Sequence, residues 1–312
     1  MTRIAALLMA STAAIALPVS AQEPESCAKV TFSDVGWTDI TATTAVTTEI
    51  LKALGYETEI KVLSVPVTYS AMATGDVDVF LGNWMPTMEA DIAPYRESGT
   101  VDTVRTNLTG AKYTLATNKA GADLGITDFA AIATHKDALG GRIYGIEPGN
   151  DGNRLLIDMV ARDLFGLGTF EVIESSEQGM LAQVAREDRA GRPIVFLGWE
   201  PHPMNARFTL TYLDGGDDLF GPDLGGAEVR TNTRAGFVSE CPNIGKLLEN
   251  LEFSLDMENQ VMGAILDDGA NPDAAARAWL QENGDIAAGW LNGVSARDGR
   301  DAAEVLDAAL QG

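Results

Sequence analysis

From residue 29 onward, short apolar stretches alternate with longer amphipathic ones. The short stretches are rich in Val, Ile and Phe, which is typical of buried strands, whereas the longer ones repeat apolar residues at helical spacing. We therefore expect strands at residues 29–32, 57–63, 77–81, 113–116, 142–146, 170–173, 193–198 and 207–213. We expect helices at residues 38–54, from 64 onward, and at 127–138, 151–164, 176–187, 242–253, 255–266, 272–282 and 302–310.

The order of these elements predicts an α/β fold with two lobes. Strand and helix alternate from residue 29, and the alternation starts again near residue 113, which predicts two mostly parallel sheets flanked by helices and joined by two crossings. We expect residues 22–111 and 208–312 to form lobe I, and residues 112–207 to form lobe II. A cleft between such lobes lies at the carboxyl ends of the strands, so residues that hold a ligand should come just after strands.

The first 21 residues have the pattern of a cleaved secretory signal. Arg3 precedes an apolar stretch that is too short to span a bilayer, and Val19-Ser20-Ala21 supplies the small residues of a cleavage site. A lipid anchor on Cys27 is disfavoured, because Pro24-Glu25-Ser26 is not the small, apolar sequence expected before a lipidated cysteine. An unanchored receptor is retained only where an outer membrane encloses it, so we expect the periplasm.

Composition narrows the class of function. A net charge of -23 argues against nucleic acid, whose phosphates need a basic surface, but it favours a cationic ligand only weakly. The two histidines, His135 and His202, belong to no HExxH motif, and no GxSxG elbow is present, so we expect no enzyme, metal or cofactor. Cys27 and Cys241 are the only cysteines, and in an oxidising compartment we expect them to form a disulfide.

Three of the five tryptophans share a local pattern. Trp37 follows KVTFSDVG, Trp84 follows DVDVFLGN and Trp199 follows PIVFLG, so each comes after a predicted strand. A single such tryptophan is more often part of a core, and we expect Trp279 and Trp290 in the helical tail to be core residues. Three at equivalent strand ends, in both lobes, instead predict a surface that a ligand covers.

Tyr113, where the chain crosses between the lobes, supplies a fourth ring for the same volume. A cage of rings suits a quaternary ammonium, whose diffuse charge donates no hydrogen bond but is attracted by the ring quadrupoles. Each contact contributes ~0.5–1 kcal/mol when exposed and ~2 kcal/mol or more when desolvated. Sugars, in contrast, stack on one or two rings and need many polar partners.

Two residues are candidates for the polar end of the cage. The Asp39 carboxylate can neutralise the ammonium or accept a hydroxyl hydrogen, although an acidic residue in the first turn of a helix is equally well explained by the helix dipole. Asn150, in the glycine-rich segment 147–153, offers a donor and an acceptor. The alternative for that segment is an ordinary turn in which Asp151 caps the next helix.

Several stretches resemble the choline-binding periplasmic proteins of ABC importers, within the wider group that binds glycine betaine and related solutes. The resemblance covers nearly the whole mature chain, and it is most specific in FSDVGWTDITATT, VDVFLGNWMPTMEADI, AKYTLATN, YGIEPGNDGNR, ESSEQGMLAQVAR and VFLGWEPHPMN. It implies a two-lobed, two-hinge protein with one disulfide that closes on its solute and delivers it to an inner-membrane permease. It further implies which residues contact the ligand. An aromatic box is implied at Trp37, Trp84, Tyr113 and Trp199, and polar contacts are implied at Asp39 and Asn150.

Choline is the expected ligand, because a carboxylate at Asp39 would repel the carboxylate of glycine betaine, proline betaine or carnitine. These betaines are the closest alternative, and acetylcholine is expected to bind more weakly than choline. Two other classes stay open from the residues alone: an enzyme that hydrolyses choline esters, and a structural or adhesive periplasmic protein. We expect the protein to act as a monomer.

Overall fold

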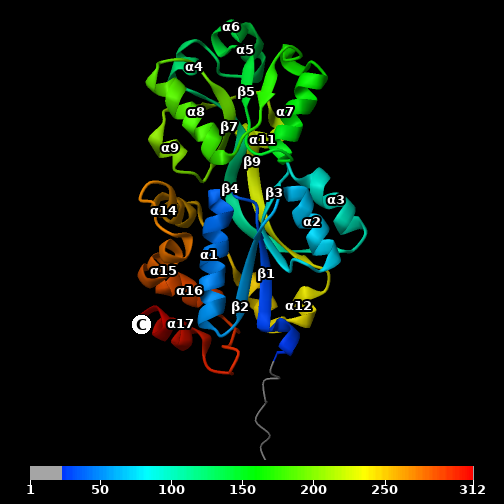
Figure 1. Cartoon of the computed structure of the whole chain (residues 1–312), viewed down its shortest axis with the longest axis vertical. Coiled ribbons are helices and arrows are strands. Elements are labelled where there is room, and N and C mark those ends of the chain that lie inside the picture. The colour runs from blue at the N-terminus through cyan, green and yellow to red at the C-terminus, as the bar shows by residue number, and fades with distance from the viewer. Residues whose placement is uncertain (1–22, 312) are drawn as a thin grey trace, which may run out of the picture.

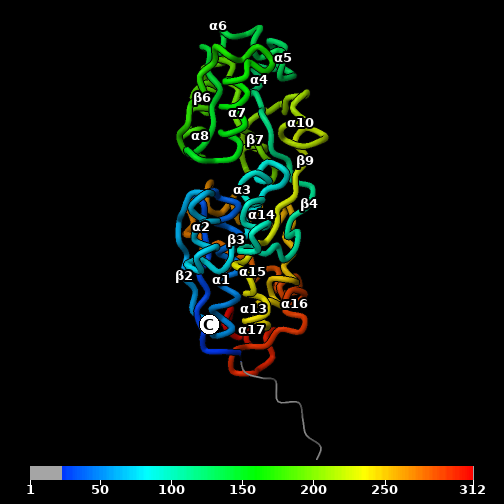
Figure 2. The backbone as a smooth tube through the Cα atoms, turned by 90° about the vertical axis from the view of Figure 1, so that its right-hand side faces the viewer, coloured from blue at the N-terminus to red at the C-terminus, as the bar shows by residue number. Residues whose placement is uncertain are grey.

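The computed structural model describes residues 23–311, so the predicted signal segment lies outside the described residues. Two lobes follow one another along the long axis of the molecule (Figure 1). One lobe contains the first and last parts of the chain, the other contains the middle part, and strands β4 and β9 run from one lobe into the other, as the side view also shows (Figure 2). The predicted two-lobed α/β class is confirmed.

Within residues 23–311, nine strands form one mixed sheet in the order β2-β1-β3-β9-β4-β7-β5-β6, with β8 paired to β4. Parallel pairs lie at both ends of the sheet, β1 with β2 and β3, and β5 with β6 and β7. The central strands β4 and β9 are antiparallel to each other and to their neighbours. The strands are β1 (Lys29–Asp34), β2 (Glu57–Val62), β3 (Val79–Met85), β4 (Val101–Asn118), β5 (Arg142–Tyr144), β6 (Glu171–Ile173), β7 (Val195–Glu200), β8 (Leu210–Tyr212) and β9 (Gly226–Arg234).

The hydrophobic pattern gave no signal for β9 and predicted only residues 113–116 of β4. The reason is that the buried positions of β9 are polar: Thr231, Asn232 and Thr233 are fully covered. The Asn232 side chain accepts a hydrogen bond from the Tyr69 hydroxyl at 3.3 Å and donates to Thr103 at 3.1 Å. Hydrogen bonds thus satisfy the Asn232 side chain in a buried polar layer that an apolar pattern cannot reveal.

The helices cover both faces of the sheet (Figure 1). Helices α14 and α15 have the bounds predicted from the sequence, 255–266 and 272–282. The helix expected at 127–138 is divided into α5 and α6 at His135, and α3 and α16 were not predicted. The helices are α1 (Thr38–Ala53), α2 (Val65–Thr74), α3 (Glu89–Glu97), α4 (Lys119–Asp123), α5 (Phe129–Thr134), α6 (Lys136–Leu139), α7 (Asp151–Ala161), α8 (Glu177–Arg189), α9 (Met204–Arg207), α10 (Asp217–Phe220), α11 (Pro222–Gly225), α12 (Phe237–Glu240), α13 (Pro242–Asn250), α14 (Leu255–Leu266), α15 (Pro272–Glu282), α16 (Gly284–Trp290) and α17 (Ala302–Gln311).

Residues that follow position 207 still contact the middle part of the chain. Strand β8 pairs with the end of β4, with Tyr212 opposite Ala116, and the Phe220 ring lies 5.9 Å from the ring of Phe129 in α5. Residues 208–225 therefore pack with the middle part of the chain. We propose that the chain crosses between the lobes in β4 and again in β9.

A disulfide and a pair of stacked tryptophans lie in the lobe that contains the first and last parts of the chain. Cys27 and Cys241 form the predicted disulfide, which links residues 214 positions apart. Trp279 and Trp290 stack at 5.9 Å in the helical tail with only 5% of each side chain exposed, as expected of core residues. Between residues 23 and 311, no helix combines the length and apolar character needed to cross a membrane.

Candidate ligand-binding site

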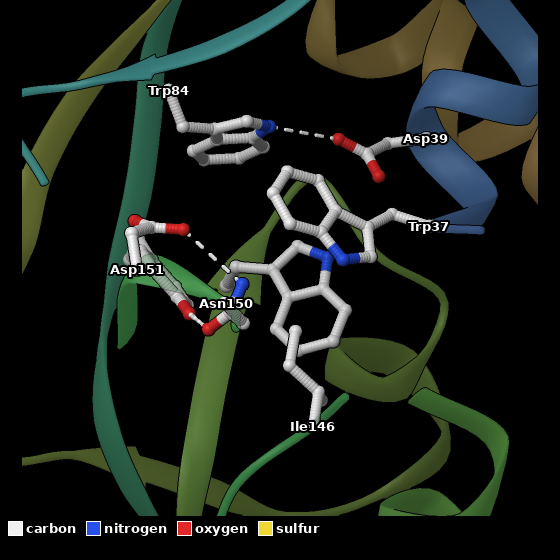
Figure 3. Close-up of a pocket in the computed structure, with 8 residues that line it drawn as sticks. Trp37, Asp39, Trp84, Ile146, Asn150 and Asp151 are labelled. Atoms are coloured by element: carbon white, nitrogen blue, oxygen red, sulfur yellow. Dashed lines mark hydrogen bonds between the residues drawn. The ribbon is translucent and has the colours of Figure 1, made fainter. Parts of the chain in front are cut away.

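A small cavity lies where the two lobes meet. All six residues predicted from the sequence lie around it, together with two that were not predicted (Figure 3). The lining consists of Trp37, Asp39, Trp84, Tyr113, Ile146, Asn150, Asp151 and Trp199.

Trp37 is placed by the turn between β1 and α1. Asp34 ends β1, and its carboxylate accepts hydrogen bonds from the Gly36 N–H at 2.7 Å and from the Thr41 hydroxyl at 2.7 Å. Gly36 has a φ of +84°, which glycine adopts without the strain that a side chain would cause. Trp37 itself occupies the N-cap position of α1, so its ring extends from the helix start into the cavity.

Trp84 and Trp199 lie in the last residues of β3 and β7, rather than after the strands as predicted. Tyr113 lies directly opposite Trp199 in the β4–β7 ladder, and their ring centroids are 6.3 Å apart. Trp84 lies 6.0 Å from Tyr113 at an interplanar angle of 61°. Neighbouring strands β4 and β7, together with β3 on the far side of β9, thus hold three rings edge to face around one side of the cavity, and Trp37 closes it from the helix side.

The four rings are almost completely buried, with 4–5% of each exposed. Trp37 is tied across the cleft, since its indole N–H donates to the Glu147 carboxylate at 2.8 Å. The structure therefore has the lobes closed over the cavity.

Asp39 faces the cavity from the first turn of α1 and is 2% exposed. Its Oδ2 accepts a hydrogen bond from the Trp84 indole N–H at 3.0 Å (Figure 3). Burial, and next the nearby Glu177 carboxylate, raise the pKa of Asp39 to about 7, although the bond from Trp84 acts in the opposite direction. Helix-dipole stabilisation alone does not explain a carboxylate held in so dry a place.

Asn150 is the N-cap of α7, where Asp151 was the predicted candidate. Its Oδ1 accepts from the Asn153 N–H at 3.1 Å and from the Tyr113 hydroxyl at 3.0 Å, and its amide donates to Asp151 at 3.1 Å. Gly152, two residues later, leaves room for Tyr113, because a Cβ there would lie 2.0 Å from the tyrosine hydroxyl.

Asp151 is the polar residue that the sequence reasoning missed. It is fully buried in the first turn of α7, and burial raises its pKa to about 6. Among residues 23–311, Asp39 Oδ1 and Asp151 Oδ2 are buried acceptors without a hydrogen-bond partner. The second unpredicted residue, Ile146, lies two positions after β5, where it extends the apolar wall. The sequence could have indicated both residues, because Ile146 follows a strand and Asp151 begins a helix.

The cavity is suited to a cation. Two carboxylates and four aromatic rings line it, and none of its eight lining residues is basic. A third carboxylate, Glu147, lies behind Trp37, and burial raises its pKa to about 7. Buried carboxylates without a cationic partner cost free energy, which a positively charged ligand would offset.

Comparisons with known proteins agree with this geometry. Residues 28–282 match the family described as the substrate binding domain of ABC-type glycine betaine transport systems. An ABC-transporter choline binding protein in complex with choline is 68% identical, with a TM-score of 0.91 over 92% of this chain and 100% of that chain. Its unliganded, semi-closed form has a TM-score of 0.85 over 92% of this chain and 99% of that one.

A third relative is the uncharacterised protein ORF1 of Chromohalobacter salexigens, which is 51% identical over 139 residues, or 45% of this chain and 89% of that protein. The matched family segment spans most of both lobes and includes every residue that lines the cavity. The chain therefore belongs to the family of substrate-binding domains of ABC-type glycine betaine transport systems.

Proposed function

We propose that this protein captures choline in the cavity between its lobes and delivers it to the permease of an ABC importer. The observation that carries the proposal is the combination of four rings and two buried carboxylates around one small volume, each carboxylate having one oxygen that accepts no hydrogen bond. The rings attract the trimethylammonium group through cation–π contacts, which strengthen when closure removes water. The 68% identical protein, whose structure contains choline, supports the same ligand.

Each residue has a proposed role. Trp37, Trp84, Tyr113 and Trp199 surround the trimethylammonium group, and Asp39 neutralises its charge. The choline hydroxyl binds at the opposite side, where Asn150 can donate its remaining amide hydrogen and Asp151 Oδ2 can accept.

Glycine betaine, proline betaine and carnitine are the closest alternative ligands, because the family is named for glycine betaine transport. Their carboxylate would meet Asp151 or Asp39, and the eight lining residues provide no Arg or Lys to receive it. Like charges brought together at low dielectric cost several kcal/mol, on the order of 4 kcal/mol at 4 Å with an effective dielectric of ~20. This repulsion favours choline, and acetylcholine should bind more weakly because its ester needs additional room.

We also propose that the protein works as a periplasmic monomer without a chemical step. A titration of tryptophan fluorescence tests binding, since choline against these rings should change the emission with a saturable dependence on concentration. No change at millimolar choline would favour a structural or adhesive role. Incubation with acetylcholine tests the hydrolase alternative, and we expect no acetate to be released.

Binding of choline should weaken as the pH falls. Choline carries a permanent charge, so pH acts only on the protein. With the pKa of Asp39 raised to about 7, the carboxylate gains a proton and loses its charge as the pH falls through neutrality. A single protonation with that pKa makes affinity about tenfold weaker at pH 6 than at pH 8.

Isothermal titration calorimetry at pH 8, 7 and 6 measures this dependence. The pKa values of Glu147, raised to about 7, and of Asp151, raised to about 6, act in the same direction. Asp39→Asn should therefore reduce the dependence without abolishing it. An equal affinity at pH 8 and pH 6 in the unmodified protein would contradict the proposed role of Asp39.

A further inference from the structure

Glu177 is a buried carboxylate that does not line the cavity but joins the two lobes beside it. It begins α8 in the second lobe, and its two oxygens accept hydrogen bonds from Thr38 in the first lobe. The Thr38 N–H donates to Oε2 at 2.8 Å and the Thr38 hydroxyl donates to Oε1 at 2.5 Å. The two residues are 139 positions apart in the chain and are at most 4% exposed.

This contact completes the start of α1. Thr38 is the first residue of α1, so its N–H has no acceptor within its own helix. Glu177 supplies that acceptor from the other lobe. Its carboxylate also meets the positive end of the α1 dipole and lies in the first turn of α8, where negative charge is favoured as well.

Glu177 also contacts the end of β7. His202 Nδ1 accepts a hydrogen bond from the Met204 N–H at 3.0 Å, so the proton lies on Nε2, which donates to Glu177 Oε1 at 3.2 Å. The His202 ring lies 5.0 Å from the ring of Trp199. One carboxylate thus connects the helix start that carries Trp37 and Asp39 with the strand end that carries Trp199.

The other polar links between the lobes are weaker candidates for this role. Arg154 in α7 donates to Asp91 in α3 at 2.6 Å, but its side chain is 42% exposed, and exposed ion pairs contribute ~0–1 kcal/mol. Glu147 accepts a single bond, from Trp37, which itself lines the cavity. Of these three links, only Glu177 is both buried and separate from the residues that line the cavity.

We propose that Glu177 is a positioning residue that holds the lobes closed over the bound solute. The inference rests on the proposed function, because closure serves capture. When the lobes separate, the Thr38 N–H and hydroxyl lose their acceptor and both sides are hydrated. The contact therefore stabilises the closed form alone, so its loss should speed ligand release and leave ligand entry unchanged.

Stopped-flow tryptophan fluorescence can separate these two rates in the full-length mature protein. Glu177→Gln should raise the dissociation rate of choline on the order of tenfold or more, the cost of losing a charged hydrogen-bond acceptor, and change the association rate by less than about twofold. Glu171→Gln is the matched control. It makes the same change in the same lobe at a side chain that is 68% exposed, and it should alter neither rate.

A second variant tests the contact itself. Thr38→Val removes only the hydroxyl donor and should speed dissociation severalfold, and Thr38→Ser, which keeps both donors, should behave as the unmodified protein. In a double-mutant cycle, Thr38→Val should have little further effect once Glu177→Gln is present. If circular dichroism shows that the Glu177→Gln variant does not fold, Thr38→Val alone tests the contact.

Three outcomes would overturn the role of Glu177: unchanged dissociation in either variant, a slower association as the main effect, or additive effects in the cycle. Failure of the choline assignment is distinguishable, because it would appear in the unmodified protein. Since Glu177 does not touch the ligand, the same rates measured with glycine betaine should show the same acceleration in the variants. The contact between Glu177 and Thr38 is thus tested whichever solute binds.

Discussion

Trp84→Ala should weaken choline binding by on the order of 100-fold or more. The change removes a desolvated ring, for which a cation–π contact contributes ~2 kcal/mol. It also removes the N–H that donates to Asp39 at 3.0 Å, and leaving a buried acceptor unpaired costs ~1–3 kcal/mol. Because 1.4 kcal/mol corresponds to a factor of ten, the two losses together predict this magnitude. Calorimetric titration of the purified variant measures it.

Trp84→Phe is the matched control for this change. It keeps an aromatic face toward the ligand but lacks the indole N–H, so we expect an intermediate loss of about tenfold, from the unpaired Asp39 oxygen. If alanine and phenylalanine weaken binding equally, the ring does not contact the cation. If neither variant weakens binding by tenfold, the cage is not the site.

Asp39→Asn should change selectivity as well as affinity. Asparagine has almost the same shape and its oxygen can still accept from Trp84, so the variant removes charge and little else. Choline binding should weaken by about tenfold or more, since a buried charge pair loses one partner. Glycine betaine should be affected less, because its carboxylate is freed from repulsion. The dissociation constant of glycine betaine divided by that of choline should therefore fall at least about fivefold.

Parallel calorimetry with the two ligands gives this ratio. Asp256→Asn is a suitable control, because Asp256 is exposed at the start of α14 and its loss changes the net charge by the same amount. An unchanged ratio in Asp39→Asn would remove this carboxylate from the selectivity. An equal change in Asp256→Asn would assign the effect to net charge instead of to position.

The sequence was most informative where burial is apolar. The strands before Trp37, Trp84 and Trp199 are apolar runs, so their positions, and with them three of the rings, could be predicted. Asp39 was correctly placed at the cavity, but whether it caps the helix or faces a ligand could be decided only by its bond to Trp84 across 45 positions. No local pattern contains that contact.

The features that the sequence did not predict depend on buried polar residues or on contacts between residues far apart in the chain. β9 was missed because its buried face is Thr and Asn, and with it the single sheet that joins the lobes. Asp151 resembled an ordinary helix cap, and Glu177 an ordinary residue of a helix first turn. Asp151 accepts a hydrogen bond from Asn150, which the Tyr113 hydroxyl contacts from β4. Glu177 accepts hydrogen bonds from Thr38 in the other lobe.

The most direct measurement is calorimetric titration of the unmodified mature protein with choline and with glycine betaine under the same conditions. An aromatic cage with two buried carboxylates and no basic lining residue predicts that choline binds with a dissociation constant at least about tenfold lower than that of glycine betaine. Equal affinities, or tighter binding of glycine betaine, would contradict the assignment of this cavity to choline.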